Sequence, residues 1–254
     1  MSILNHKRLS FFFLFVTLLV SPAFAEEMID GSKPHKLITG GLRVGINRSC
    51  TSINYDKIFH DVKNLDNDWK TGFDIGLVIN LNISKFLSFQ PGLYFQNRSS
   101  DSSVSAGNNN GDMSIINRHS RFYYFTFPIL ASMKFQLGNG FELMAELGPY
   151  FSWGLGGNTV STGMSTIIGE NGTMGVNTSK EKYDFFGDGT IKNVQMKTFD
   201  WGFKIGTGFR FMHRYLIMFH YNAGCSNIAN KNESYMKDPS AKNQSWTLSL
   251  GYDF

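Results

Sequence analysis

The chain has 254 residues, a formal net charge of +4, 17% charged residues and two cysteines. This length suits one large domain or two small ones. The small charge, with no basic stripe, excludes a nucleic-acid-binding protein, and two cysteines in this length exclude a disulfide framework.

The N-terminus has the order of a secretory signal peptide. The charged start "NHKRLS" precedes the apolar run "FFFLFVTLLV", and "SPAFA" then ends in a small-x-small cleavage site. The apolar run is shorter than the roughly 20 residues of a spanning helix, which argues against a membrane anchor. We predict cleavage after Ala25, a periplasmic segment over residues 26–36 and one barrel domain over residues 37–254.

After this start, apolar and small polar residues alternate in eight segments, which predicts eight strands with two different faces. The segments are Leu37–Asn47, Gly72–Ile83, Phe86–Gln96, Arg121–Gln136, Phe141–Gly154, Thr198–Phe211, Tyr215–Ser226 and Ser245–Phe254. The connections alternate in length. Those near Ser84, Asn139 and His213 are very short, whereas those near 49–69, 99–119, 156–196 and 226–242 are long and polar. Outer-membrane barrels have this asymmetry of short periplasmic turns and longer outside loops.

The composition of the two faces favours a membrane. One face is large and aromatic, with Trp153, Trp201, Tyr215 and Trp246 near strand ends, as in a bilayer girdle. The other face is rich in Gly, Ser, Thr and Asn, which suits the crowded interior of an eight-stranded barrel. We therefore predict an all-β, eight-stranded antiparallel up-and-down transmembrane β-barrel. The alternative is a soluble lipocalin-like barrel, in which the aromatic face would line a ligand cavity.

The last strand, "SWTLSLGYDF", supports the membrane interpretation. Leu250, Tyr252 and Phe254 lie on its apolar face, and the chain ends on the aromatic residue. This ending resembles the C-terminal signature by which barrel assembly machinery recognises its clients. We therefore expect outer-membrane lipid and that machinery among the partners.

Charged residues on the polar face are the first candidates for chemistry. They are Arg43, Asp74, Lys134, Glu142, Glu146, Lys204 and Arg210. Glu142 and Glu146 lie near one another, and paired carboxylates can catalyse proton transfer. The alternative, which we favour, is a structural ion-pair network that fills the lumen.

Two further features leave alternatives open. Cys50 and Cys225 lie at loop-side strand ends of the first and seventh strands, so either a disulfide at the rim or two free thiols fits the sequence. His220 falls mid-strand on the lumen face, where a structural role competes with a rim-located lipid-modifying or proteolytic site. The scattered histidines show no metal spacing, and we predict no catalytic residue, metal or cofactor.

Short strand patterns carry a family resemblance. The segments "GGLRVGIN", "FYYFTFPILASMKF", "ELMAELGPYFSWGLGG", "FDWGFKIGTGFR" and "YNAGCSNIAN" resemble successive strands of the PorT-type outer membrane β-barrel family of Bacteroidetes. The resemblance implies a Gram-negative outer-membrane location and carries over no catalytic residue. We expect a non-enzymatic barrel that acts through its extracellular loops or as an envelope component. The alternative is an accessory of a secretion or assembly machine, with other envelope or secretion proteins as partners.

Overall fold

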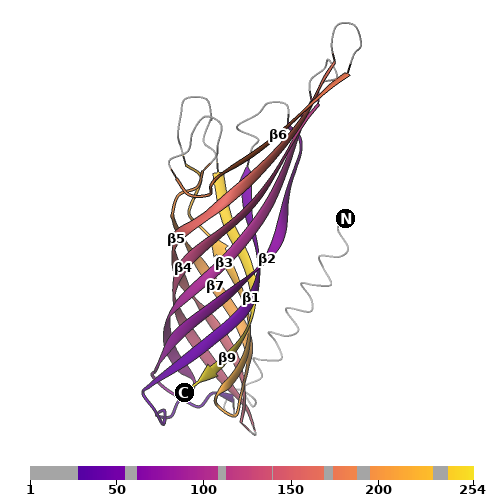
Figure 1. The fold of residues 1–254 in the computed structure, drawn as a ribbon. Coiled ribbons are helices and arrows are strands. Elements are labelled where there is room, and N and C mark those ends of the chain that lie inside the picture. The colour runs from indigo at the N-terminus through magenta and orange to yellow at the C-terminus, as the bar shows by residue number, and fades with distance from the viewer. Residues whose placement is uncertain are drawn as a thin grey trace, which may run out of the picture.

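The structure is a computed structural model that describes residues 28–54, 62–107, 113–138, 140–168, 174–187, 195–230 and 240–254. The predicted signal peptide and its cleavage site after Ala25 lie outside these residues. Nine strands form one antiparallel sheet (Figure 1). They are β1 (Ile38–Asn54), β2 (Val62–Asn82), β3 (Leu87–Gly107), β4 (Met113–Gly138), β5 (Phe141–Ile168), β6 (Met174–Asp184), β7 (Phe199–Phe211), β8 (Tyr215–Gly224) and β9 (Ser240–Asp253).

Eight of these strands close a ring. Each of β1 to β4 pairs with the next strand, β5 pairs with β7, the ring continues through β8 to β9, and β9 pairs back with β1. The closing ladder runs from Gly41 opposite Asp253 to Asn54 opposite Ser240. Closure satisfies the backbone hydrogen bonds that an open sheet would expose to lipid. The predicted eight-stranded antiparallel barrel is therefore confirmed.

The ninth strand, β6, lies within the connection that we expected to be a long loop between 156 and 196. It pairs with the outer part of β5, from Asn158 opposite Asp184 to Ile168 opposite Met174. The expected loops near 49–69 and 99–119 also carry strand, because β1 runs beside β9 as far as Asn54 and β2, β3 and β4 continue beyond the ring. Outer parts of five strands thus form an extension sheet: 62–69 of β2, 100–107 of β3, 113–121 of β4, 158–168 of β5 and β6. Figure 1 shows this sheet leaning away from the barrel.

The apolar face points outward. Large side chains that would be buried in a soluble protein are exposed all round the ring, among them Leu77 at 60%, Ile205 at 56% and Leu250 at 63%. Burial alternates along most of β7 and β8. Polar and small residues of β7 lie inside, whereas Leu216 and Met218 of β8 form a small apolar cluster inside with Met144, and His220 and Asn222 follow them. This is the pattern of a lipid-facing surface, so the lipocalin-like alternative, with an aromatic cavity inside, is wrong.

Aromatic pairs lie at both ends of this outer face. Tyr215 and Tyr252 make an edge contact near the turn end, with ring centroids 5.4 Å apart. Trp153 and Phe199 lie 5.2 Å apart near the loop end. Such rings sit at the level of the headgroups, and the span between the two levels is the part that faces acyl chains.

Three tight turns lie at the end of the barrel opposite the extension sheet, and they join β2 to β3, β4 to β5 and β7 to β8. Gly138 and Gly140 take positive φ between β4 and β5, and Met212 and His213 take φ of 50° and 60° between β7 and β8. Two successive positive φ angles are those of a type I′ hairpin turn, whose twist matches that of the strands. This geometry also brings the His213 ring toward the lumen at the turn end, where it contacts Glu142.

Candidate functional site

The middle of the lumen holds a buried carboxylate and a histidine. Oε2 of Glu146 on β5 lies 2.8 Å from Nε2 of His220 on β8, and the two side chains are 3% and 5% exposed. A Cβ at Gly206 would overlap the imidazole ring, so glycine on β7 leaves the space that His220 fills. His220 therefore lies mid-strand inside the barrel, as expected. Its side chain is buried, unlike one at an exposed rim site.

Above this pair, Asp200 of β7 gathers polar groups from four other parts of the ring. Its Oδ2 lies 3.6 Å from Nη1 of Arg98 and accepts hydrogen bonds from Tyr150 and Asn243, while Oδ1 accepts one from Ser226. The Asp200 side chain is fully buried, and that of Arg98 is 2% exposed. Buried charges need such partners, because an isolated one is costly to desolvate.

An apolar cap lies over the Asp200 cluster. It consists of Ile53, Val104, Phe122, Tyr124, Phe185, Phe186, Met196, Ile228, Ala229 and Ala241. Phe122 and Phe185 stack with centroids 4.0 Å apart, and Phe186 makes an edge contact with Tyr124 at 5.3 Å. The chain after β6 thus enters the barrel mouth rather than projecting from it. Polar clusters below and the cap above fill the lumen with side chains.

The residues predicted for a lumen network are inside the barrel, and Asp253 joins two of them, Arg43 and Arg210, while others have partners of their own. Arg43 donates to Asp253 of β9 at 2.7 Å, and Arg210 pairs with Glu142. Lys134 donates to Asn82 at 2.8 Å, and the ammonium of Lys204 lies 4.6 Å from the ring centre of Tyr94.

The remaining predicted carboxylates do not meet. Glu142 and Glu146 bind different partners, Arg210 and His220, so they do not act as a carboxylate pair. Asp74 is 2% exposed, and its Oδ1 has no hydrogen-bond partner in the structure.

Sequence reasoning missed Arg98 and Phe185. Both fall near or within stretches that read as polar loop, so neither belonged to an alternating segment. Asp200 was on the predicted polar face, but its central role depends on register between strands, which the sequence does not reveal. The adjacent aromatics Phe185 and Phe186 in a polar stretch were the available signal for the cap.

The two cysteines are both free. Cys50 is buried, whereas Cys225 is exposed. The rim disulfide that the sequence left open is not formed in the structure. Gln244 of β9 lies opposite Cys50 on one side and opposite Ala223 on the other, so a whole strand separates Cys50 from Cys225.

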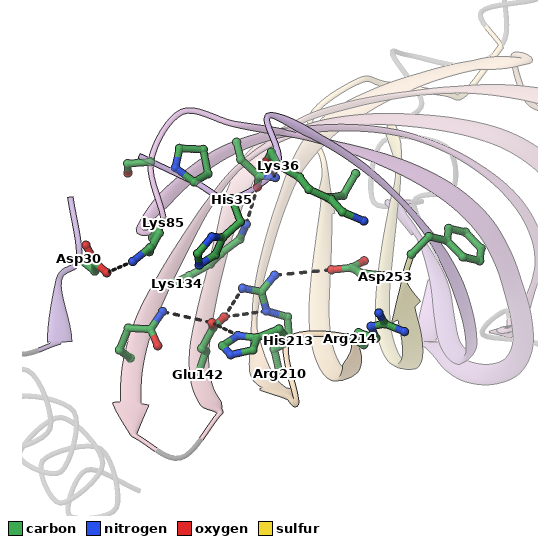
Figure 2. A pocket seen from close by; sticks show the side chains of 16 residues that line it. Asp30, His35, Lys36, Lys85, Lys134, Glu142, Arg210, His213, Arg214 and Asp253 are labelled. Carbon is green, nitrogen blue, oxygen red and sulfur yellow. Dashed lines mark hydrogen bonds and ion pairs between the residues drawn. The ribbon is translucent and has the colours of Figure 1, made fainter. Parts of the chain in front are cut away.

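The turn end of the barrel opens into a vestibule, a cavity of about 480 Å³ lined by side chains from the turns and from the segment before β1 (Figure 2). Figure 2 shows Arg210 between Glu142 and Asp253; its Nε donates to Glu142 at 2.6 Å, and Nη1 lies 3.7 Å from Asp253. His213 Nδ1 lies 3.0 Å from the other oxygen of Glu142.

Positive charge predominates in this vestibule. Its lining includes the cations Lys36, Lys85, Lys134, Arg210 and Arg214, against the carboxylates Asp30, Glu142 and Asp253. Lys85 binds Asp30 at 2.9 Å, and this hydrogen bond holds the pKa of the Asp30 carboxyl well below its usual range. The lining therefore has an excess of cations over carboxylates, an environment that favours an anionic group.

The extension sheet presents a different surface. Just beyond the apolar belt, Asp101 on β3 binds Lys70 at 2.9 Å and His119 at 2.5 Å. The hydrogen bond to Asp101 raises the pKa of Lys70. Further out, β6 pairs with β5 alone among the described strands, and its residues from Gly175 to Lys182 are exposed. An edge of this kind can pair with another extended chain.

Among the described residues, no group of three or more His, Cys, Asp or Glu side chains is placed to hold a metal ion. Across the same part of the chain, no helix is both long and apolar enough to cross a membrane.

Comparisons with known proteins agree with the strand topology. The family description "Outer membrane protein beta-barrel domain" matches residues 31–230. A search of curated proteins found no match.

Three solved structures match most of this chain at low identity and low TM-score. Ail, the attachment invasion locus protein of Yersinia pestis, is 12% identical, with 85% of this chain and 98% of that chain covered and a TM-score of 0.33. The outer membrane protein OprG from Pseudomonas aeruginosa is 10% identical, with 88% and 99% covered and a TM-score of 0.37. Neisserial surface protein A is 9% identical, with 85% and 97% covered and a TM-score of 0.33.

Proposed function

Since the chain belongs to the outer membrane protein beta-barrel domain family, we propose that it is a non-enzymatic surface protein that acts through its extension sheet. The observation that carries this proposal is the contrast between the two ends of the fold. Side chains fill the lumen and the apolar cap covers it, while strands of the ring continue outward as a sheet with an exposed edge. A filled eight-stranded barrel suits a scaffold better than a channel.

Two measurements test this proposal. In planar bilayers, the purified barrel is expected to give no steady open-pore conductance, and a stable conductance would contradict a sealed scaffold. On intact cells, a photo-crosslinker at Thr178 on β6 is expected to capture a macromolecule. The matched control at Leu77, in the lipid belt, is expected to yield lipid adducts alone. Equal capture at both positions would argue against the extension sheet as the binding surface.

A second candidate is an accessory role in an outer-membrane secretion or assembly machine. The cationic vestibule supports it, because an acidic segment of a periplasmic partner would find Lys36 and Arg214 at the cavity wall. Cross-linking in intact cells followed by purification tests this role. Machine components should be recovered with the native chain and lost in the double variant Lys36→Glu, Arg214→Glu. Lys33→Glu, outside the cavity lining, is the control, and recovery of the barrel alone contradicts the accessory role.

We also infer a place among PorT-type barrels of Bacteroidetes and export by cleavage after Ala25. The strand motifs quoted above support the first inference, and the charged, apolar and small-residue order of the N-terminus supports the second. Mass spectrometry of the mature N-terminus tests the cleavage: a chain beginning at Glu26 is expected, and an intact Met1 would contradict it.

A further inference from the structure

A lateral groove of about 630 Å³ indents the lipid-facing surface near the loop end. Its walls come from three neighbouring strands of the ring: Ile46 of β1, Phe219 of β8, and Trp246 and Leu248 of β9. Arg48 of β1 and Trp69 of β2 form its outer end. The volume lies in the range of roughly 300–1,000 Å³ that small-molecule sites occupy.

A departure of β2 from β1 creates the groove. Pairing between the two strands ends at Ser49 opposite Lys70, whereas β1 remains paired with β9 as far as Asn54. The β2–β3 register shifts between Trp69 and Phe73, so β2 bulges there. The outer face thereby opens between β2 on one side and the β1, β8 and β9 surface on the other.

The inner face stays closed at the same level. Ser49 Oγ donates to the Ser99 carbonyl at 2.8 Å, and Thr51 N donates to Ser100 Oγ at 2.9 Å, so β1 contacts β3 directly. A Cβ at Gly72 would overlap the carbonyl of Asn97, so the close approach requires glycine at that position. The groove is therefore an indentation of the membrane surface and does not open into the lumen.

The groove walls are mostly apolar and aromatic, with Asn47, Arg48 and Thr71 as the polar residues of the lining. The Trp246 ring stacks on Phe219 with centroids 5.2 Å apart, and it contacts Tyr221 at 4.2 Å. Ile46 is 62% exposed and Leu248 is 48% exposed, which is the surface that lipid chains cover in an embedded barrel. A pre-formed apolar groove holds one acyl chain in a defined place, because its walls need no rearrangement.

A positive charge, that of Arg48, lies at the outer end of the groove. Arg48 is exposed, and its Nη2 donates to the Trp69 carbonyl at 3.0 Å. No carboxylate within ion-pair distance of Arg48 is found in the described chain, whereas neighbouring Lys70 is paired with Asp101. A guanidinium without a carboxylate, beside tryptophan at the membrane interface, is suited to a phosphate.

We propose that this groove binds one phosphate-bearing lipid of the outer leaflet, with an acyl chain against Trp246 and the phosphate on Arg48. The site is independent of the extension sheet's partner and of the vestibule. It would anchor β2 where the strand leaves the ring, since the lipid bridges Trp69 and the β1–β9 wall.

Native mass spectrometry of the full chain in detergent, titrated with phosphatidylglycerol, tests the proposal. The wild type should retain one lipid at detergent ratios that strip the others. Arg48→Gln should weaken retention about tenfold, the effect of losing a hydrogen bond to a charged group. Ile46→Trp, which fills the groove with an outward side chain, should abolish it.

Matched controls separate this site from general lipid contact. Arg121→Gln removes another exposed arginine, and Ile79→Trp enlarges another outward isoleucine, so both should retain lipid as the wild type does. Equal loss in the controls, or unchanged retention in Ile46→Trp, would overturn the proposal. Inorganic phosphate alone should not bind, and its binding with equal strength would show an anion site without a lipid. A shift of each variant between boiled and unboiled gel samples verifies folding.

Discussion

Phe186 occupies the space where a side chain on Gly154 would lie. A Cβ at this inward position of β5 would overlap the Phe186 ring, which packs on Tyr124 and Phe185 in the apolar cap. The position of Phe186 in the cap thus depends on a glycine of β5, a strand of the barrel wall. A larger residue at Gly154 would compete with Phe186 for the barrel mouth.

We predict that Gly154→Val releases the cap. The displaced Phe185 and Phe186 should become accessible, and chymotrypsin should cleave after them at least tenfold faster than in the native chain, which corresponds to about 1.4 kcal/mol in local opening. Thr162→Val, at an exposed position further along β5, is the control and should leave the cleavage rate unchanged. An unaltered rate in Gly154→Val would mean that the cap tolerates the extra volume.

The Glu146–His220 pair is expected to stabilise the barrel rather than to catalyse a reaction. His220→Ala leaves the buried Glu146 with the 3.4 Å hydrogen bond from Ser132 Oγ and without its histidine, and should lower the free energy of unfolding by about 3 kcal/mol. Urea unfolding in detergent micelles measures this. The double variant Glu146→Leu, His220→Leu should lose less than the single one, because no unpaired charge remains. A greater loss in the double variant would contradict this account.

The sequence predicted the faces of the strands well because lipid and lumen impose opposite polarity on successive residues. In β7, for example, Phe203 is 51% exposed while neighbouring Lys204 is 3% exposed, as the alternation required. The same logic explains the failure at β6. Its sequence "MGVNTSKEKYD" has polar residues on both faces, since most of the strand lies in water, so no period of two distinguishes it from a loop.

Partners across the lumen could not be predicted for a different reason. Arg98 meets Asp200 only because the ring closes with a particular stagger, and a shift of two residues would keep every face correct yet change every pair. The vestibule and the lateral groove likewise depend on turn geometry and on the β2 bulge, which alternation does not encode.

The segment before β1 should stay attached to the barrel in mild acid. Asp30 binds Lys85, and backbone bonds join Asp30 and Ser32 to the β2–β3 turn. The hydrogen bond from Lys85 depresses the Asp30 pKa. The stability that the Asp30–Lys85 contact contributes is therefore present above the unfolded pKa of about 3.9, and it is lost only as the pH falls through the lower folded pKa. Hydrogen exchange at Lys85 and Phe86 amides, corrected for intrinsic rate, should therefore show equal protection at pH 7 and pH 5.

Asp30→Asn provides the matching variant. It removes the ionic contact without changing side-chain size, so protection of the Lys85 and Phe86 amides should fall at both pH values. Lys33→Gln, which changes a neighbouring exposed charge, should leave protection unchanged. Loss of protection in the native chain between pH 7 and pH 5 would show that another group controls the segment.

The last two residues of the chain should have separable roles. Asp253 faces the lumen and accepts a hydrogen bond from Arg43 at 2.7 Å, joining the last strand to the first. Phe254 is 63% exposed on the outer side, where its ring contacts Tyr252 at 5.5 Å. Asp253 therefore contributes to closing the ring, whereas the Phe254 side chain faces the surroundings of the barrel.

We predict that Asp253→Ala lowers the free energy of unfolding of the refolded barrel by about 3 kcal/mol, because Arg43 is left as a buried, unpaired charge. Phe254→Ala should leave that free energy within about 0.5 kcal/mol of the native value, as surface substitutions usually do. In cells the order should reverse: Phe254→Ala should reduce the amount of folded barrel in the outer membrane, because the C-terminal signature that we predict for the assembly machinery is incomplete. Heat-modifiable band intensity in membrane fractions, compared with refolding yield in detergent, measures both effects. A loss of refolding yield in Phe254→Ala equal to its loss in cells would place its role in stability instead of recognition.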